Sequence, residues 1–129
     1  MTKPIRVLYV DDDLSFLEIV KVILEKDGNF LVSISPAGDA ALKLLDQGEY
    51  DIVLSDCRMV RMDGIRFREK VRDMYPEMPF IFFTGREKGE RISRLLDRST
   101  FYLQKSGDPE VQFARLTDLI ISCLPHDTC

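Results

Sequence analysis

Six side chains that could do metal or phosphoryl chemistry stand at the ends of short apolar runs in this chain. They are Asp11, Asp12, Asp13, Asp56, Thr84 and Lys105. The three acids in LYVDDD (8–13) repel one another, and in a partly desolvated site one of them would take up a proton unless a cation joined them. Alternatively, these acids lie in a solvated loop and open the next helix, whose N-terminus favours anions.

Asp56, Thr84 and Lys105 favour the cation over simple solvation. Carboxylates from two strand ends can hold a hard dication such as Mg²⁺, which keeps several waters and needs only one or two protein carboxylates. If Asp56 attacks a phosphorus atom, Thr84 can donate a hydrogen bond to the phosphoryl group and Lys105 can add positive charge. Together these residue types are the ingredients of phosphoryl transfer to a carboxylate nucleophile.

The elements that must position these side chains alternate between two periodicities. Short β-rich runs occur at 5–10, 30–34, 51–55, 79–83 and 101–103. Several are nearly continuous in apolar residues, as expected for strands covered on both faces. Helical patterns separate them, so the sequence predicts an α/β fold with a doubly wound, five-stranded parallel sheet and helices on both faces. In such a sheet ligands bind at the carboxyl ends of the strands.

Apolar spacing and end signals place the helices between these strands. The first helix carries an apolar stripe that precedes Gly28 and consists of Phe16, Leu17, Val20, Ile23 and Leu24. Ser35 is predicted to cap the second helix, with Pro36 at its first position and Gly48 at its end. Asp108 is predicted to open the last helix.

Composition and charge restrict the class of protein. The chain has 129 residues, of which 45% are hydrophobic and 31% charged, a balance typical of a globular domain rather than a disordered segment. Its formal net charge of −4 argues against a general nucleic-acid surface. No apolar run approaches the ~20 residues of a membrane span. The three cysteines lack metal-ligand spacing and suit a reducing compartment.

Four motifs together resemble the receiver domain of two-component response regulators. They are LYVDDD (8–13), DIVLSDCRMVRMDG (51–64), FIFFTG (80–85) and FYLQK (101–105). They occur in the order and with the separations of that family, and they cover nearly the whole chain. The resemblance implies the flavodoxin-like receiver fold, with residues 1–129 as a single receiver domain, a structured core over 5–124 and no output domain.

The resemblance also implies a phosphoacceptor and a Mg²⁺ site. Asp56 corresponds to the phosphoacceptor. Asp12 corresponds to the direct Mg²⁺ ligand, with Asp11 assisting and the backbone carbonyl of Arg58 completing the protein ligands. Asp13 matches no ligand position of the family, so we expect it to cap a helix or to be solvated.

Three further positions correspond to the family's switch. Thr84 corresponds to the hydroxyl that moves toward the phosphoryl group, and Lys105 to the ammonium that contacts it. Tyr102 corresponds to the aromatic residue whose rotamer follows Thr84. Alternatively, Tyr102 is an ordinary half-buried strand residue.

The chain departs from the family pattern at several positions. Val60 and Ser106 stand where the family usually has prolines, so whether the Lys105–Ser106 bond is cis is open. Residues 97–100 replace a small-residue pair before the last strand. We also expect Arg58 and Arg86 to flank the pocket and slow hydrolysis of the acyl phosphate; alternatively, both point into solvent.

The resemblance implies its partners. A histidine kinase or a histidine phosphotransfer protein would donate the phosphoryl group. The switched domain would control a downstream protein or a self-dimer through the fourth helix, fifth strand and fifth helix. We expect a cytoplasmic signalling domain without enzymatic activity beyond its own phosphorylation and dephosphorylation, and without direct contact with nucleic acid or membrane. It is either a stand-alone regulator or part of a larger sensor kinase or regulator.

Two other functions are weighed against this one. A receiver-shaped binding module that is never phosphorylated would explain the missing prolines. A hydrolase of the haloacid-dehalogenase kind would use Asp11 and Asp13 as its Asp-x-Asp pair. It would leave Asp56 unexplained, and only Asp108 and Glu110 follow the lysine as candidate metal ligands.

Overall fold

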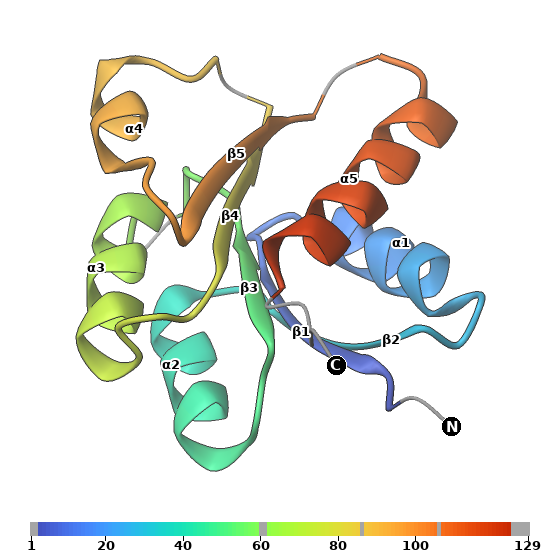
Figure 1. Ribbon diagram of the computed structural model, residues 1–129, viewed down its shortest axis with the longest axis horizontal. Helices are drawn as coiled ribbons and strands as arrows, with labels where there is room; N and C mark the ends of the chain where they lie inside the picture. Colours follow the sequence, from blue (N-terminus) through green and yellow to red (C-terminus); the bar gives the residue numbers. More distant parts are fainter. Residues whose placement is uncertain (1–2, 60–61, 86, 106, 125–129) are drawn as a thin grey trace.

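The computed structural model describes residues 3–59, 62–85, 87–105 and 107–124 as a sheet between two layers of helices (Figure 1). The elements follow one another as β1 (Ile5–Val10), α1 (Leu14–Glu25), β2 (Phe30–Ser35), α2 (Gly38–Gln47), β3 (Ile52–Ser55), α3 (Gly64–Met74), β4 (Phe80–Thr84), α4 (Glu90–Leu95), β5 (Thr100–Gln104) and α5 (Pro109–Cys123). Each predicted strand is present, with ends that differ by one residue or agree. The α/β alternation predicted from the sequence is confirmed.

The sheet is parallel and its strand order is β2-β1-β3-β4-β5. Because β1 lies between β2 and β3, the chain winds in one direction from β1 to β2 and in the other from β3 to β5. This is the doubly wound, flavodoxin-like order that the sequence predicted, and its switch point lies between β1 and β3. All five strands therefore present their carboxyl ends at the same edge.

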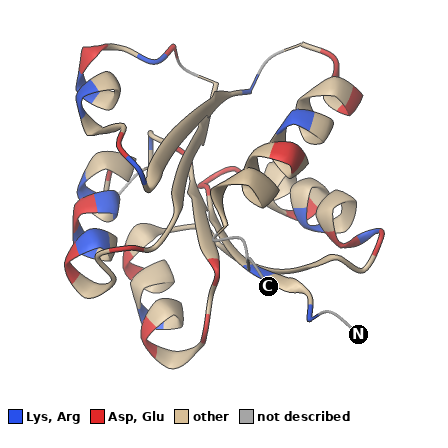
Figure 2. Ribbon diagram, in the orientation of Figure 1, with Lys and Arg blue, Asp and Glu red and all other residues tan. Residues whose placement is uncertain are grey.

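Two apolar cores lie on opposite faces of the sheet, because alternate strand residues point to opposite sides. Val7, Tyr9, Ile81 and Phe83 face α1 and α5. Leu8, Val10, Phe80 and Phe82 face α2, α3 and α4. Figure 2 shows that the strands carry almost no charge and that the charged residues lie on helices and loops. This double burial explains why the strands are nearly continuous in apolar residues.

Aspartates cap three helices; the sequence predicts that Asp108 opens one and that Asp13 caps one or is solvated. Asp13 accepts a hydrogen bond from Phe16 N, Asp63 from Arg66 N, and Asp108 from Glu110 N. Each satisfies a backbone N–H that the first helical turn leaves without a partner.

Three local predictions are wrong. Pro36 is not at the first position of the second helix, because α2 begins at Gly38. Ser35 does not cap the second helix: it ends β2, is buried, and its hydroxyl donates to the carbonyl of Ala37, which is the N-cap without a side-chain hydrogen bond. Ile23 is 39% exposed although it was assigned to the inward stripe. Strand β2 continues through Ser35, so the helix begins later than the capping signal predicts.

Residues 97–100, where the chain departs from the family pattern, are held by α3. Arg68 donates to Thr100 Oγ1 at 3.1 Å and pairs with Asp97 at 3.1 Å. Arg72 donates to the same Thr100 hydroxyl at 3.0 Å and to the carbonyl of Ser99 at 3.3 Å. The buried Thr100 hydroxyl therefore joins α3 to the start of β5.

Within the described part of the chain, no helix is long and apolar enough to cross a membrane. The longest, α5, has 15 residues, whereas a bilayer span needs about 20.

Candidate functional site

The candidate site lies at the carboxyl edge of the sheet, beside the switch point. Asp11 follows β1, Asp56 follows β3, Thr84 ends β4 and Lys105 follows β5. Asp12 lies next to Asp11 in the loop before α1. The strand order brings four of these residues together, Asp11, Asp12, Asp56 and Lys105, as the contacts below show.

Asp11, Asp12 and Asp56 form a carboxylate cluster that fits a divalent cation. Each offers one oxygen, and the three oxygens lie within 4.8 Å of one another. Asp11 is buried, Asp56 is partly buried and Asp12 is exposed, so a cation could be held while one side stays open to water. An all-oxygen, acidic and partly open donor set suits Mg²⁺, which retains several of its waters.

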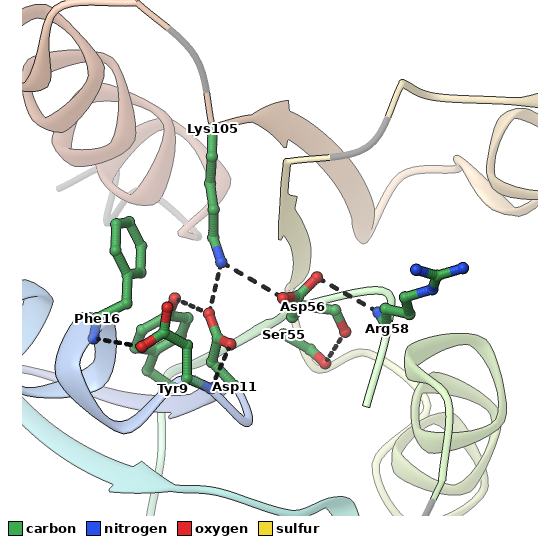
Figure 3. A network of polar contacts seen from close by, with 8 residues as sticks. Tyr9, Asp11, Phe16, Ser55, Asp56, Arg58 and Lys105 are labelled. Carbon is green, nitrogen blue, oxygen red and sulfur yellow. Dashed lines mark hydrogen bonds and ion pairs between the residues drawn. The ribbon is translucent and has the colours of Figure 1, made fainter. Parts of the chain in front are cut away.

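Asp11 is fully buried and accepts three hydrogen bonds (Figure 3). The Tyr9 hydroxyl donates to Oδ2 at 2.6 Å, Lys105 Nζ donates to the same oxygen at 2.5 Å, and Asp13 N donates to Oδ1 at 3.0 Å. Burial raises the pKa of Asp11, and its hydrogen bonds from Lys105 and Tyr9 offset part of that rise. Burial and the neighbouring Asp11 charge raise the pKa of Tyr9, so its hydroxyl stays a proton donor.

Lys105 bridges the two carboxylates that follow β1 and β3. Its Nζ lies 2.5 Å from Asp11 Oδ2 and 3.4 Å from Asp56 Oδ2, as Figure 3 shows. Only 15% of the Lys105 side chain is exposed. Its backbone N donates to the carbonyl of Thr84 at 2.7 Å, which ties the end of β5 to the end of β4.

The loop after β3 fixes Asp56 through its backbone. Ser55 Oγ donates to the carbonyl of Asp56 at 2.8 Å, and Arg58 N donates to Asp56 Oδ1 at 3.3 Å. Gly64 N donates to the carbonyl of Cys57 at 2.8 Å. A Cβ atom at Gly64 would lie 2.3 Å from the Asp56 carbonyl oxygen and 2.8 Å from Cys57 Cα, so only glycine permits α3 to begin this close to the loop.

Arg58 contributes its backbone, whereas its side chain is exposed. In Figure 3 the guanidinium group points away from Asp56, which agrees with the alternative that it faces solvent. The prediction that its carbonyl binds Mg²⁺ stays a prediction. Arg86, Val60 and Ser106 lie outside the described residues, and so does the Lys105–Ser106 bond.

The predicted switch residues lie on the neighbouring strands β4 and β5. Thr84 is 1% exposed and pairs in register with Gln104, while Tyr102 pairs with Phe82. Tyr102 is half-buried and packs against the core that faces α2, α3 and α4. Burial, together with the charges of Glu87 and Cys57, raises the pKa of Tyr102. A coupled movement of Thr84 and Tyr102 stays a prediction.

Three residues at the site were not singled out from the sequence: Tyr9, Phe16 and Gly64. Tyr9 had a usable signal, because it stands two residues before Asp11, and alternate residues of a strand point to the same face. The close approach of Gly64 to Asp56 has no signal in the sequence. Phe16 was assigned to the core stripe, and its distance to Lys105 depends on tertiary packing.

Comparison with known proteins shows the family. Residues 7–117 match the family model of the response regulator receiver domain. Response regulator Rre1 of Synechocystis is 31% identical over 123 residues, which are 93% of this chain and 53% of that protein. The transcriptional regulatory protein GlrR of Escherichia coli is 27% identical over 95% of this chain and 28% of its own length. The chain therefore spans about half or less of these relatives.

Solved structures agree with the assignment. Response regulator protein TrrA of Thermotoga maritima, solved in complex with Mg²⁺-BeF, has a TM-score of 0.79 and 25% identity over 93% of this chain and 99% of that one. TrrA in complex with the histidine kinase ThkA matches with the same TM-score and identity. The chain belongs to the response regulator receiver family, the signalling domain of two-component systems.

Proposed function

We propose that Asp56 of this receiver domain accepts a phosphoryl group from a phosphorylated histidine. The supporting observation is the placement of Asp56: it contributes an oxygen to the three-carboxylate cluster, and its Oδ2 lies 3.4 Å from Lys105 Nζ. A carboxylate oxygen of Asp56 forms the new bond to phosphorus while the nitrogen–phosphorus bond of the phosphohistidine breaks. The histidine imidazole keeps the electron pair and takes up a proton.

The residues around Asp56 have separate parts in this reaction. Asp11, Asp12 and Asp56, with the carbonyl of Arg58, would hold Mg²⁺, which supplies positive charge for the phosphoryl oxygens when bound. Lys105 carries a second positive charge within reach of the same position. Thr84 donates a hydrogen bond to the phosphoryl group, and Tyr102 follows it to shift a two-state equilibrium. The Mg²⁺-BeF complex of TrrA supports the metal site.

The proposed donor is a histidine kinase or a histidine phosphotransfer protein, as the ThkA–TrrA complex supports. We infer that the domain acts in the cytoplasm, without direct contact with nucleic acid or membrane. The downstream partner or a second copy would bind the surface of α4, β5 and α5. Helix α5 exposes two large apolar side chains, Val111 and Ile121. The compact unit over residues 5–124 would be a single receiver domain.

Intact-mass analysis after incubation with acetyl phosphate tests the proposal. We expect one phosphoryl adduct in the wild type that requires Mg²⁺ and is absent from Asp56→Asn. Asp63→Asn is the matched control: it makes the same change of charge in the same loop, and asparagine keeps the cap of α3. This variant should be phosphorylated normally.

The alternatives predict other results. A folded wild type without an adduct, beside a control receiver that is modified, would support the unphosphorylated binding module. Steady turnover of a phosphomonoester that depends on Asp11 rather than Asp56 would support the phosphohydrolase. An adduct that survives in Asp56→Asn would place the phosphoacceptor elsewhere.

A further inference from the structure

The ammonium of Lys105 has two kinds of neighbours. The first are the carboxylates of Asp11 and Asp56, at 2.5 and 3.4 Å. The second are two phenylalanine rings: Nζ is 4.4 Å from the centroid of Phe16 and 5.5 Å from that of Phe83. A cation within about 6 Å of a ring centroid is attracted by the negative face of the ring, and the attraction strengthens when water is excluded.

The two rings are held in place by their own packing. Phe83 is fully buried in β4, and its centroid lies 6.0 Å from that of Phe16. Phe16 also stacks on Phe113 of α5, with centroids 6.3 Å apart and an angle of 27° between the planes. Three elements, α1, β4 and α5, therefore fix the ring that lies against Lys105.

The same short segment positions the ring and the metal-binding acids. Asp11 Oδ1 accepts from Asp13 N, and Asp13 Oδ1 accepts from Phe16 N at 3.1 Å. The loop after β1 and the first turn of α1 are thus one hydrogen-bonded unit. Figure 3 shows Phe16 beside Asp11 and Lys105, with a hydrogen bond at its backbone N.

We propose that Phe16 is a positioning residue for phosphorylation of Asp56. Its ring face, together with that of Phe83, holds the Lys105 ammonium between Asp11 and Asp56, so the charge lies in place before a phosphoryl group arrives. This inference rests on the proposed function of Asp56. It differs from simple packing, because an aliphatic leucine would fill most of the space but offer no negative face to the ammonium.

Fluorinated phenylalanines distinguish attraction of the ammonium by the ring face from simple packing. Each added fluorine weakens the negative ring face and changes the volume little. With one, two and three fluorines at position 16, we expect a stepwise fall in the rate of phosphorylation by acetyl phosphate at saturating Mg²⁺. Phe16→Leu should lower the rate by about 2- to 30-fold, the range of a cation–π contact, and Phe16→Trp should retain it.

Position 113 provides the matched control. Phe113 stacks on Phe16, and the rings over which the Lys105 ammonium lies are those of Phe16 and Phe83. The same fluorinated series there should leave the rate unchanged. Equal rates across the series at position 16, or an unimpaired Phe16→Leu, would overturn the proposal.

A second measurement keeps this inference apart from the proposed function. The ε-methylene protons of Lys105 should show an upfield ring-current shift by NMR, and Phe16→Leu should move it toward the ordinary value. If the wild type forms no adduct at Asp56, the positioning role fails with the proposed function, and the NMR shift then reports whether the ring contact exists without that role. An ordinary shift in the wild type would contradict the contact itself.

Discussion

At the level of single residues, the site depends on how a fully buried carboxylate is satisfied. Asp11 is removed from water and accepts from the Tyr9 hydroxyl, the Lys105 ammonium and the Asp13 amide. A buried carboxylate is costly unless its lone pairs are hydrogen-bonded and its charge is compensated. Tyr9 therefore belongs to the chemistry of the site although it stands within an apolar strand.

Tyr9→Phe tests this contribution. The variant keeps the ring in the core and removes one donor from Asp11, so we expect the free energy of unfolding to fall by about 1–3 kcal/mol. Tyr75→Phe is the control, since its hydroxyl donates to the neutral carbonyl of Leu45 at 2.9 Å. Urea unfolding in the presence of a chelator measures both. If Tyr9→Phe lowered the free energy of unfolding by no more than Tyr75→Phe, the proposed contribution of the Tyr9–Asp11 hydrogen bond would be contradicted.

At the level of elements, helices hold the sheet through specific polar contacts as well as apolar packing. At the sheet edge, Glu25 of α1 accepts from Val32 N at 2.8 Å, and Lys21 donates to the carbonyl of Val32 at 2.5 Å. These two contacts satisfy backbone groups of β2, which is an edge strand. At the other side, Arg68 and Arg72 join α3 to Thr100.

Glu25 makes the folding stability of this edge of the sheet depend on pH. The hydrogen bond from Val32 N, and then Lys21, lower the pKa of Glu25 below its ordinary value. Because the folded state lowers this pKa, the stabilisation is present above the unfolded-state pKa and is lost as the pH falls through the folded-state pKa. We expect Glu25→Gln to be less stable than wild type at neutral pH, by less than about 1 kcal/mol for this partly exposed pair.

The free energy of unfolding of both proteins, measured between neutral pH and about pH 3, tests the direction of this pH dependence. The difference in free energy between wild type and Glu25→Gln should shrink as the pH falls. A constant difference would show that the amide and the carboxylate differ in packing rather than in charge.

At the level of the whole molecule, the site exists only when the sheet is complete. Lys105 is separated from Asp11 by 94 positions and from Asp56 by 49, and the three residues follow three different strands. A cation bound by Asp11, Asp12 and Asp56 would therefore bind the folded chain and not the unfolded one. Such binding stabilises the fold by mass action.

Mg²⁺ should accordingly raise the thermal unfolding midpoint. At ten times its dissociation constant the expected gain is about 1.4 kcal/mol, a rise of a few degrees for a domain of this size. Asp12→Asn should weaken the response. Asp13→Asn is the matched control, because it changes the same charge one residue away and keeps the cap of α1. The metal site would be contradicted if Mg²⁺ did not raise the unfolding midpoint of the wild type, or if both variants lost the same part of that rise.

The sequence by itself determined the alternation of strands and helices, the aspartate caps, and the set of acids, hydroxyl and ammonium at the strand ends. Periodicity and turn chemistry act over a few residues, so these features can be read without knowing the partners of each element. Ser35 shows the limit of such local signals: serine is a typical helix cap, but here it is the last residue of strand β2.

Tertiary structure decided which of those side chains meet. The contacts of Lys105 with Asp11 and with the Phe16 ring depend on strand order and on how α1 docks. The requirement for glycine at position 64 depends on how closely α3 approaches the loop of Asp56. Pairings between residues tens of positions apart have no local signal, because packing across the whole sheet selects them.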